Sequence, residues 1–352
     1  AVGSCTSLTM LFTALALGFS IGAGVLVAQY FGAQKLDEVR RIASTSIVLF
    51  LALGAGMSVL GVVLTRPLLA GLLQTPEALL EMAVTYFMIY TAGLIFQFGY
   101  NITAAILRAI GDSKATLYFL FASSLLNVVL DLLLVAVVKM GVAGAAVATV
   151  ISQLLSCVLS FWYMHKKYEF LRFSPQELRF EPKLARRVLT IGAPMAVQQS
   201  VVSCGFMFMQ RLVNSCGEDM VASFTVGSRI ENYLILPTLS FQSTMATYTG
   251  QNIGAKQPER VSRGLRQVIG LAICITLPLS AVAYFLAPQI IALFAISGQA
   301  AAYCTQHLHL AAWAVLVFAV YFPCTGLHQG AGEGQYATAC AALALGVRVA
   351  LA

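Results

Sequence analysis

Residues 29–41 read QYFGAQKLDEVRR, and residues 251–263 read QNIGAKQPERVSR. The two segments share five identical residues, and an acidic residue stands at the ninth position of each. A second pair, RAIGD at 108–112 and QGAGE at 329–333, recurs at a separation of 221 residues instead of 222. Recurrence at a near-constant separation indicates two copies of one structural unit.

The composition indicates that these units lie in a membrane. Of 352 residues, 59% are hydrophobic and 10% are charged, whereas soluble domains average about 25% charged residues. This excludes an ordinary soluble enzyme. Ten apolar segments recur between polar loops, and most of them are 21 to 31 residues long, whereas about 20 residues suffice to cross a hydrocarbon core. We therefore expect an all-α polytopic membrane protein with helices at about 8–30, 42–65, 79–107, 116–137, 142–164, 188–210, 220–250, 267–287, 300–327 and 337–352.

Basic residues are concentrated in alternate loops. The loops at 31–41, 108–115, 165–187 and 251–266 hold 16 Lys and Arg residues, and the intervening loops hold three. Cytoplasmic loops carry the excess of Lys and Arg in membrane proteins, so these four loops are expected on the cytoplasmic side. Because no continuous basic face results, the net charge of +7 does not indicate a nucleic-acid partner.

The longest polar loop, 165–187, separates five apolar segments from five others. We expect an N-terminal lobe at 1–164, a cytoplasmic linker at 165–187 and a C-terminal lobe at 188–352. Six predicted helices separate the repeated segments, and an even number preserves orientation, so the lobes are expected to be parallel repeats. Shifting the predicted helices by the repeat distance runs past both ends of the chain. We therefore expect two six-helix lobes of which about ten helices are present, the chain being truncated at both ends.

Charged residues inside the apolar segments are candidates for function, because burying a charge at membrane depth costs several kcal/mol. Asp131 is one such residue, and Asn127 lies on the same helix face four residues earlier. The next segment carries Thr149 in a polar seam with Ser152, Gln153 and Ser156. Their oxygens suit a proton or Na⁺. Alternatively, Asp131 only stabilises helix packing.

The second half offers a candidate substrate cavity. Arg229 and Glu231 lie in the segment 220–250 and face different directions, so they need not pair with each other. The nearby polar residues are Asn232 and Gln242 on the same segment and Gln198 and Gln199 on the preceding one. Alternatively, the two charged residues pair with other helices. His307 and His309 stand about 200° apart on a helix, so both cannot face the interior, and neither is assigned as a ligand.

Motifs in this order resemble the multidrug and toxic compound extrusion (MATE) transporters: QYFGA at 29–33, LRAIGDSK at 107–114, NVVLD at 127–131, GVAGAAVAT at 141–149, GAP at 192–194 and QNIGAK at 251–256. The resemblance implies two six-helix lobes that alternate between inward-facing and outward-facing states. It also implies that Asn127, Asp131 and Thr149 belong to the cation site of the first lobe. Because the first of the six helices is expected to be missing at the start of the chain, we expect no counterpart here of the family's Asp on that helix.

The expected function is secondary active antiport, in which amphipathic or cationic organic compounds are exported in exchange for H⁺ or Na⁺. The expected location is the bacterial cytoplasmic (inner) membrane, with a monomer as the working unit. No cofactor is expected besides the coupling ion, and no metal besides a possible Na⁺ at Asp131, Asn127 and Thr149. A lipid-linked saccharide flippase is the alternative, but it should place rows of basic residues in its cavity, whereas Arg229 is the single deep one. An intramembrane aspartyl protease would need a second membrane-embedded Asp, and Asp112 lies in a polar loop; no enzyme activity is expected.

Overall fold

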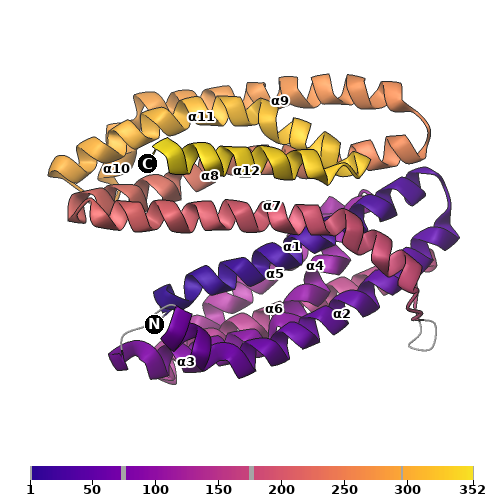
Figure 1. Cartoon of the computed structure of the whole chain (residues 1–352), viewed down its shortest axis with the longest axis horizontal. Coiled ribbons are helices and arrows are strands. Elements are labelled where there is room, and N and C mark those ends of the chain that lie inside the picture. Colours follow the sequence, from indigo (N-terminus) through magenta and orange to yellow (C-terminus); the bar gives the residue numbers. More distant parts are fainter. Residues whose placement is uncertain (1, 73–76, 174–177, 295, 352) are drawn as a thin grey trace. The chain divides into compact units, whose positions relative to one another are not determined.

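The computed structural model describes residues 2–72, 77–173, 178–294 and 296–351, and every regular element in these ranges is a helix (Figure 1). Short π-helical turns occur at η1 (Leu68–Leu72) and η2 (Leu132–Val137), and a 3-10 turn occurs at η3 (Glu169–Leu171). The α-helices are α1 (Val2–Gly32), α2 (Leu36–Pro67), α3 (Glu77–Ala92), α4 (Leu94–Ala109), α5 (Ser113–Asp131), α6 (Gly141–Lys167), α7 (Pro182–Ser215), α8 (Glu218–Gly254), α9 (Pro258–Phe285), α10 (Ala287–Ala292), α11 (Gly298–Ala331) and α12 (Gly334–Leu351).

Membrane-crossing capacity is a property of most of these helices. Within the described ranges, seven helices are long and apolar enough to cross a membrane, or up to eight if α3 and α4 form one bent span. Every one of the ten predicted segments coincides with a helix or with the α3–α4 pair. Two of the predicted spans, α8 and α12, are not among the helices that are long and apolar enough by this criterion. In α8 the cause is its polar side chains, among them Arg229 and Glu231.

The chain divides into two compact units, residues 1–203 and 204–352. The division falls inside α7, so this helix contributes to both units. In the first unit, α4 packs against α1, α2 and α6, and its fully buried side chains Leu94, Phe98 and Ile102 recur every four residues. This spacing places them on one helix face. The ring of Phe50 on α2 lies 6.2 Å from that of Phe98.

Backbone geometry repeats with the sequence. Gln34 has φ 59° and Lys256, which is 222 residues later, has φ 57°. The hydrogen bonds of the two turns also correspond: the N–H of Lys35 bonds the carbonyl of Tyr30 at 3.0 Å, and that of Gln257 bonds the carbonyl of Asn252 at 2.9 Å. The second pair of motifs behaves alike, with φ 96° at Gly111 and 85° at Gly332. Both repeated motifs therefore encode a helix end and the turn that follows it.

The predicted single segment at 79–107 is bent. The helices α3 and α4 meet at Gly93 with an angle of 43° between them. A Cβ atom at Gly93 would lie 2.5 Å from the Val150 side chain of α6. The absence of a side chain thus lets the bend sit directly against α6.

Small residues bring α1 and α7 together within the first unit. A Cβ atom at Gly22 would lie 2.5 Å from the backbone nitrogen of Gly192 and 2.6 Å from the carbonyl oxygen of Val188. One turn earlier, Gly18 faces the backbone of Ala196 equally closely. Close backbone approach at small residues is the usual way in which membrane helices gain packing contacts.

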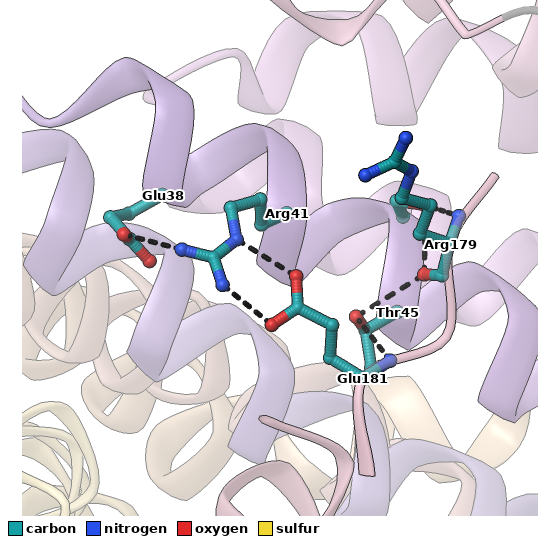
Figure 2. A network of polar contacts seen from close by, with 6 residues as sticks. Glu38, Arg41, Thr45, Arg179 and Glu181 are labelled. Atoms are coloured by element: carbon teal, nitrogen blue, oxygen red, sulfur yellow. Dashed lines mark hydrogen bonds and ion pairs between the residues drawn. The ribbon is translucent and has the colours of Figure 1, made fainter. Parts of the chain in front are cut away.

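Part of the predicted linker is attached to α2 by polar contacts (Figure 2). The Arg41 guanidinium donates to both carboxylate oxygens of Glu181, at 2.8 and 2.6 Å, and also to Glu38 at 2.8 Å. These hydrogen bonds hold the pKa of Glu181 below its ordinary value. The Thr45 hydroxyl donates to the carbonyl of Arg179 and accepts from the N–H of Glu181. The segment just before α7 is thereby fixed to the first unit.

The second unit is built on three long helices, α8, α9 and α11, which run alongside one another (Figure 1). The helices α8 and α11 approach closely because Gly326 lies against the backbone carbonyl of Gln242. A smaller apolar cluster joins Ile230 of α8, Ile291 of α10 and Leu308 of α11.

Candidate functional site

A pair of polar side chains on α5 lacks hydrogen-bond partners. The Asn127 Nδ2 and Asp131 Oδ1 atoms are buried, and neither has a hydrogen bond to any described residue. They lie four residues apart, so both point from the same face of the helix. Buried polar groups are normally hydrogen-bonded, and each exception requires an explanation. A bound cation or proton would satisfy the Asp131 oxygen, whereas the Asn127 Nδ2 atom is a donor and needs an acceptor.

Large apolar side chains of α5 are exposed, whereas Asn127 and Asp131 are half-buried, and the helix packs against α4 and α6. In a membrane protein such an exposed apolar face meets lipid. Those side chains are Leu117, Tyr118, Leu120, Phe121, Leu125, Val128 and Val129.

The register between η2 and α6 brings Thr149 level with the pair. A Cβ atom at Gly144 of α6 would lie 3.1 Å from the backbone of Leu134, so these positions are opposite one another. In antiparallel helices with equal rise per residue, Asp131 then lies opposite about residue 147 and Asn127 opposite about residue 151. Thr149 lies between those two levels. Its hydroxyl donates to the carbonyl of Ala145 at 2.9 Å, which leaves the oxygen lone pairs as acceptors.

A third unpartnered atom belongs to the same helix pair. The Gln153 Oε1 atom on α6 is buried without a hydrogen bond to any described residue. Gln153 lies four residues after Thr149, on the same face of α6. Gln153 belongs to the polar seam seen in the sequence, but the cation site predicted there consists of Asp131, Asn127 and Thr149. The structure adds it as a candidate ligand.

The helix changes form directly after Asp131. α5 ends at this residue, and η2 continues the chain as a π-helical turn from Leu132 to Val137. Its N–H of Val138 bonds the carbonyl of Leu133, five residues earlier. Single π-helical turns of this kind often occur at functional sites.

A polar network in the first unit was not predicted from the sequence. The Gln97 amide on α4 donates to the Thr13 hydroxyl on α1 at 2.9 Å, and the Tyr90 hydroxyl on α3 donates to Gln97 Oε1 at 3.4 Å. Single Gln, Thr and Tyr residues in apolar segments carry no spacing signal, because their partners come from different helices. The network links three helices of the first unit through polar side chains.

In the second unit, the structure separates Arg229 from Glu231. Arg229 is exposed, whereas Glu231 is half-buried and its carboxylate lies 3.0 Å from the Nε2 atom of His307 on α11. His309 points elsewhere, toward the carbonyl of Tyr284 at 3.1 Å. The expectation that the two histidines face different directions therefore holds. The partnership of His307 with Glu231 was not predicted, since it joins helices 76 residues apart in sequence.

The other predicted cavity residues do not gather in one described place. Asn232 is exposed and its amide donates to the carbonyl of Ser228 at 2.8 Å. Gln242 is half-buried three turns further along α8. Gln198 is buried and Gln199 is half-buried, and both belong to the first unit. A shared substrate cavity of these residues stays a prediction.

Asp112 lies at the start of α5, outside the predicted spans, and is the centre of a separate hydrogen-bond cluster. Its Oδ2 atom accepts from Lys167 Nζ at 2.8 Å, from the Tyr168 hydroxyl at 2.7 Å and from the Tyr163 hydroxyl at 2.9 Å. Its Oδ1 atom accepts from the backbone N–H of Ala115 and caps α5. Burial alone would raise the pKa of Asp112, but these hydrogen bonds lower it from 3.8 to about 2. The charged Asp112 side chain therefore connects the start of α5 to the end of α6 through hydrogen bonds.

The candidate cation ligands are oxygen atoms of different chemical types. Among the residues that the structure describes, no group of three or more His, Cys, Asp or Glu side chains could hold a metal ion. The set at α5 and α6 contains one carboxylate, two amides and one hydroxyl, a donor set that suits a monovalent hard cation or a proton.

These features define a multi-pass helical membrane protein that holds unpartnered polar side chains on its membrane-crossing helices. The chain belongs to the MatE family, whose model matches residues 1–133 and 194–352. The resemblance seen in the sequence motifs is thereby confirmed.

Individual relatives agree with this assignment. The chain is 33% identical over 262 residues to the probable multidrug resistance protein YpnP of Bacillus subtilis, a match that covers 74% of this chain and 58% of YpnP. It is 27% identical over 325 residues to the probable multidrug resistance protein YoeA of the same organism, covering 90% of this chain and 70% of YoeA. A crystal structure of MATE in complex with MaL6 matches the fold with a TM-score of 0.91 at 24% identity, covering 97% of this chain and 77% of that one.

Proposed function

We propose that this chain carries the transport machinery of a secondary active antiporter, which exports amphipathic or cationic organic compounds in exchange for H⁺ or Na⁺. The proposal includes a monomer in the bacterial cytoplasmic membrane, with no cofactor besides the coupling ion. Relatives named as probable multidrug resistance proteins support the substrate class. The chain spans 58% of the length of YpnP, so the activity is proposed for the machinery that these residues supply.

The observation that carries the proposal is the unpartnered Asp131 carboxylate with its neighbour Asn127. A carboxylate at membrane depth without a partner is costly. A proton or Na⁺ would remove that cost, and Thr149 and Gln153 would add oxygen ligands from α6. An ion can drive export only if its affinity differs between two conformations. Asp131 would therefore be ion-bound in one state and empty in the other.

Electrostatics favour this function over a lipid-linked saccharide flippase. A pyrophosphate headgroup requires several basic residues in the cavity. Among the described residues of the second unit, Arg229 is the one basic side chain far from the helix ends. It lies on the opposite side of α8 from Glu231, so no row of basic residues forms there.

The test is transport by the purified chain in proteoliposomes, with tetraphenylphosphonium as the substrate. A pH gradient and a Na⁺ gradient are imposed separately, which identifies the coupling ion. Asp131→Asn should reduce gradient-driven transport at least about tenfold, a loss typical of removing one essential charge-stabilising group. Asp37→Asn is the matched control, because Asp37 is an exposed Asp at the start of α2. Unchanged, still gradient-driven transport in Asp131→Asn would refute the coupling role.

A further inference from the structure

Glu231 and His307 form a titratable pair between α8 and α11. The His307 Nε2 atom lies 3.0 Å from the Glu231 carboxylate, and the two side chains are 22% and 27% exposed, respectively. Glu231 stands thirteen residues after the first residue of α8, which corresponds to roughly 20 Å along the helix. The pair is therefore partly shielded, far from the ends of α8, and still open to exchange with its surroundings.

One face of α8 is shaped to hold the imidazole ring. Phe224, Gly227 and Glu231 follow one another at spacings of three and four residues, so they line a single stripe. The Phe224 ring meets the His307 ring edge to face, with centroids 5.9 Å apart. A Cβ atom at Gly227 would lie 3.0–3.1 Å from three ring atoms of His307. Three successive positions of the stripe thus contact one histidine.

Other charged groups of the second unit have different contacts. On α8, Arg229 is exposed and Tyr233 is 71% exposed. On α11, His309 stacks on Tyr284 of α9, with centroids 4.2 Å apart, and Cys304 is buried in an apolar cluster. The described residues of α10 include no titratable side chain, and the charged residues of α9 lie in its first turns, namely Glu259, Arg260, Arg263 and Arg266.

The charge of the pair depends on one proton. With imidazolium and carboxylate the pair is neutral overall, and with neutral imidazole it carries one negative charge. A net charge is costly within a membrane protein unless it is compensated. Loss of the proton from His307 therefore leaves a site that favours a cation in its place. Histidine is the side chain whose ordinary titration falls in the physiological range.

We propose that Glu231 and His307 form a second proton-binding site, located in the second unit and separate from Asp131. Its ligand is a proton, which binds to the imidazole and is stabilised by the carboxylate. Its role in a transport cycle rests on the proposed antiport, in which a departing proton would make the pair attractive to a cationic substrate.

The proton site can be tested without any transport measurement. Hydrogen–deuterium exchange at the imidazole C2 position, read by mass spectrometry, reports the titration of each histidine in the purified chain from about pH 5 to about pH 9. We expect His307 to titrate reversibly in this range. We also expect Glu231→Gln to alter its exchange profile, because the substitution removes the carboxylate that lies 3.0 Å from Nε2.

Matched controls separate the pair from general effects. Arg229→Gln removes a charge two residues from Glu231 and should leave the exchange profile of His307 unchanged. His309 provides an internal reference, since Glu231→Gln should not alter its exchange profile. If Glu231→Gln fails to fold, Glu231→Asp retracts the carboxylate by one methylene group and should give a smaller change in the same direction.

Two results would overturn the proposal: His307 does not titrate in this range, or its exchange profile is the same with and without the Glu231 carboxylate. Either result leaves the Asp131 transport experiment untouched. Conversely, unchanged transport in Asp131→Asn would refute the proposed coupling site while the titration of His307 stands.

Discussion

Gln34 and Lys256 adopt the same left-handed backbone conformation, with φ 59° and 57°, at equivalent positions of two repeated motifs. Side chains other than Gly are disfavoured in this region because Cβ approaches the following carbonyl oxygen. Each residue is followed by the start of a long helix, α2 or α9. The turn that reverses the chain after α1 is therefore the same as the one after α8.

Glycine at either position should stabilise the protein. The strain of about 1–2 kcal/mol in the left-handed conformation exceeds the entropic cost of Gly, about 0.5–1 kcal/mol. Lys256→Gly should therefore raise the free energy of unfolding by up to about 1 kcal/mol, measured by thermal unfolding in detergent. Lys35→Gly is the control, because Lys35 has φ −95° and its replacement by Gly relieves no backbone strain. Equal effects of the two substitutions would contradict the argument.

The crossing of α1 and α7 should be intolerant of a methyl group. Gly22→Ala places Cβ against the backbone of Gly192, where neither partner is the end of a flexible side chain. Overpacking of this kind costs typically about 1–3 kcal/mol. Gly56→Ala makes the same substitution where no atom lies within 4 Å, and it should be neutral or slightly stabilising. A melting temperature of Gly22→Ala that is as high as that of Gly56→Ala would show that the helices can move apart without cost.

Asn127→Leu should separate stability from transport. Replacing an unpartnered buried amide by an apolar side chain of similar size is nearly neutral or stabilising, so the melting temperature should stay or rise while gradient-driven transport is lost. Asn101→Leu is the contrasting substitution, since the Asn101 amide donates to the carbonyl of Gln97 at 2.8 Å. It should lose about 0.5–1.5 kcal/mol. If Asn127→Leu is destabilised to the same degree, its amide has a partner.

The Asp112 cluster should make the free energy of unfolding depend on pH in the acidic range. The folded-state pKa of about 2 lies below the ordinary value of 3.8, so the stabilisation is complete above about pH 4. It is lost progressively as the pH falls from that value toward 2. Asp112→Asn should lower the melting temperature at neutral pH and should abolish this part of the acid dependence. Asn remains a good helix cap, so the substitution isolates the charge. Unaltered acid dependence would mean that other carboxylates control it.

The Arg41–Glu181 contact should protect the linker from proteases. Glu181→Gln removes the charge that both guanidinium hydrogen bonds use, and it should increase several-fold the rate of tryptic cleavage after Arg179. Cleavage of a locally opened segment follows the population of the open form. Glu169→Gln is the control, because Glu169 is exposed in the same linker. Equal cleavage rates in both variants would indicate that the Thr45 contacts suffice.

Sequence patterns predict the helices of this protein well, because apolar length is a local property. The bend at Gly93 was not predicted, since it depends on the close approach of Val150 from another helix. The placement of Asn127 and Asp131 on one helix face could be predicted, because a spacing of four residues places side chains on the same face. Thr149 was assigned to the site from the family resemblance, and its part in a cation site stays a prediction.

Contacts between distant helices were beyond the reach of sequence patterns. Glu231 could be recognised as an unusual charge, but its partner His307 lies on another helix, and spacing gives no information about such pairs. The attachment of Asp112 to Lys167 could not be predicted for the same reason, since 55 residues separate the two in sequence. The repeat is the exception: it relates distant residues through sequence identity alone, and the matching φ angles confirm it in the backbone.

The π-helical turn after Asp131 has a consequence for chain length. Each hydrogen-bonded ring in η2 encloses one more residue than a ring in an α-helix. Removing one residue from Leu132–Val137 can therefore convert the turn into regular α-helix with little change in the span of the segment. Such a deletion would also leave the direction in which the following side chains project nearly unchanged, because five α-helical residues turn the chain by about as much as six π-helical ones. This segment is thus the place where α5 tolerates a change in residue number, and an insertion of one residue is the simplest origin of the turn.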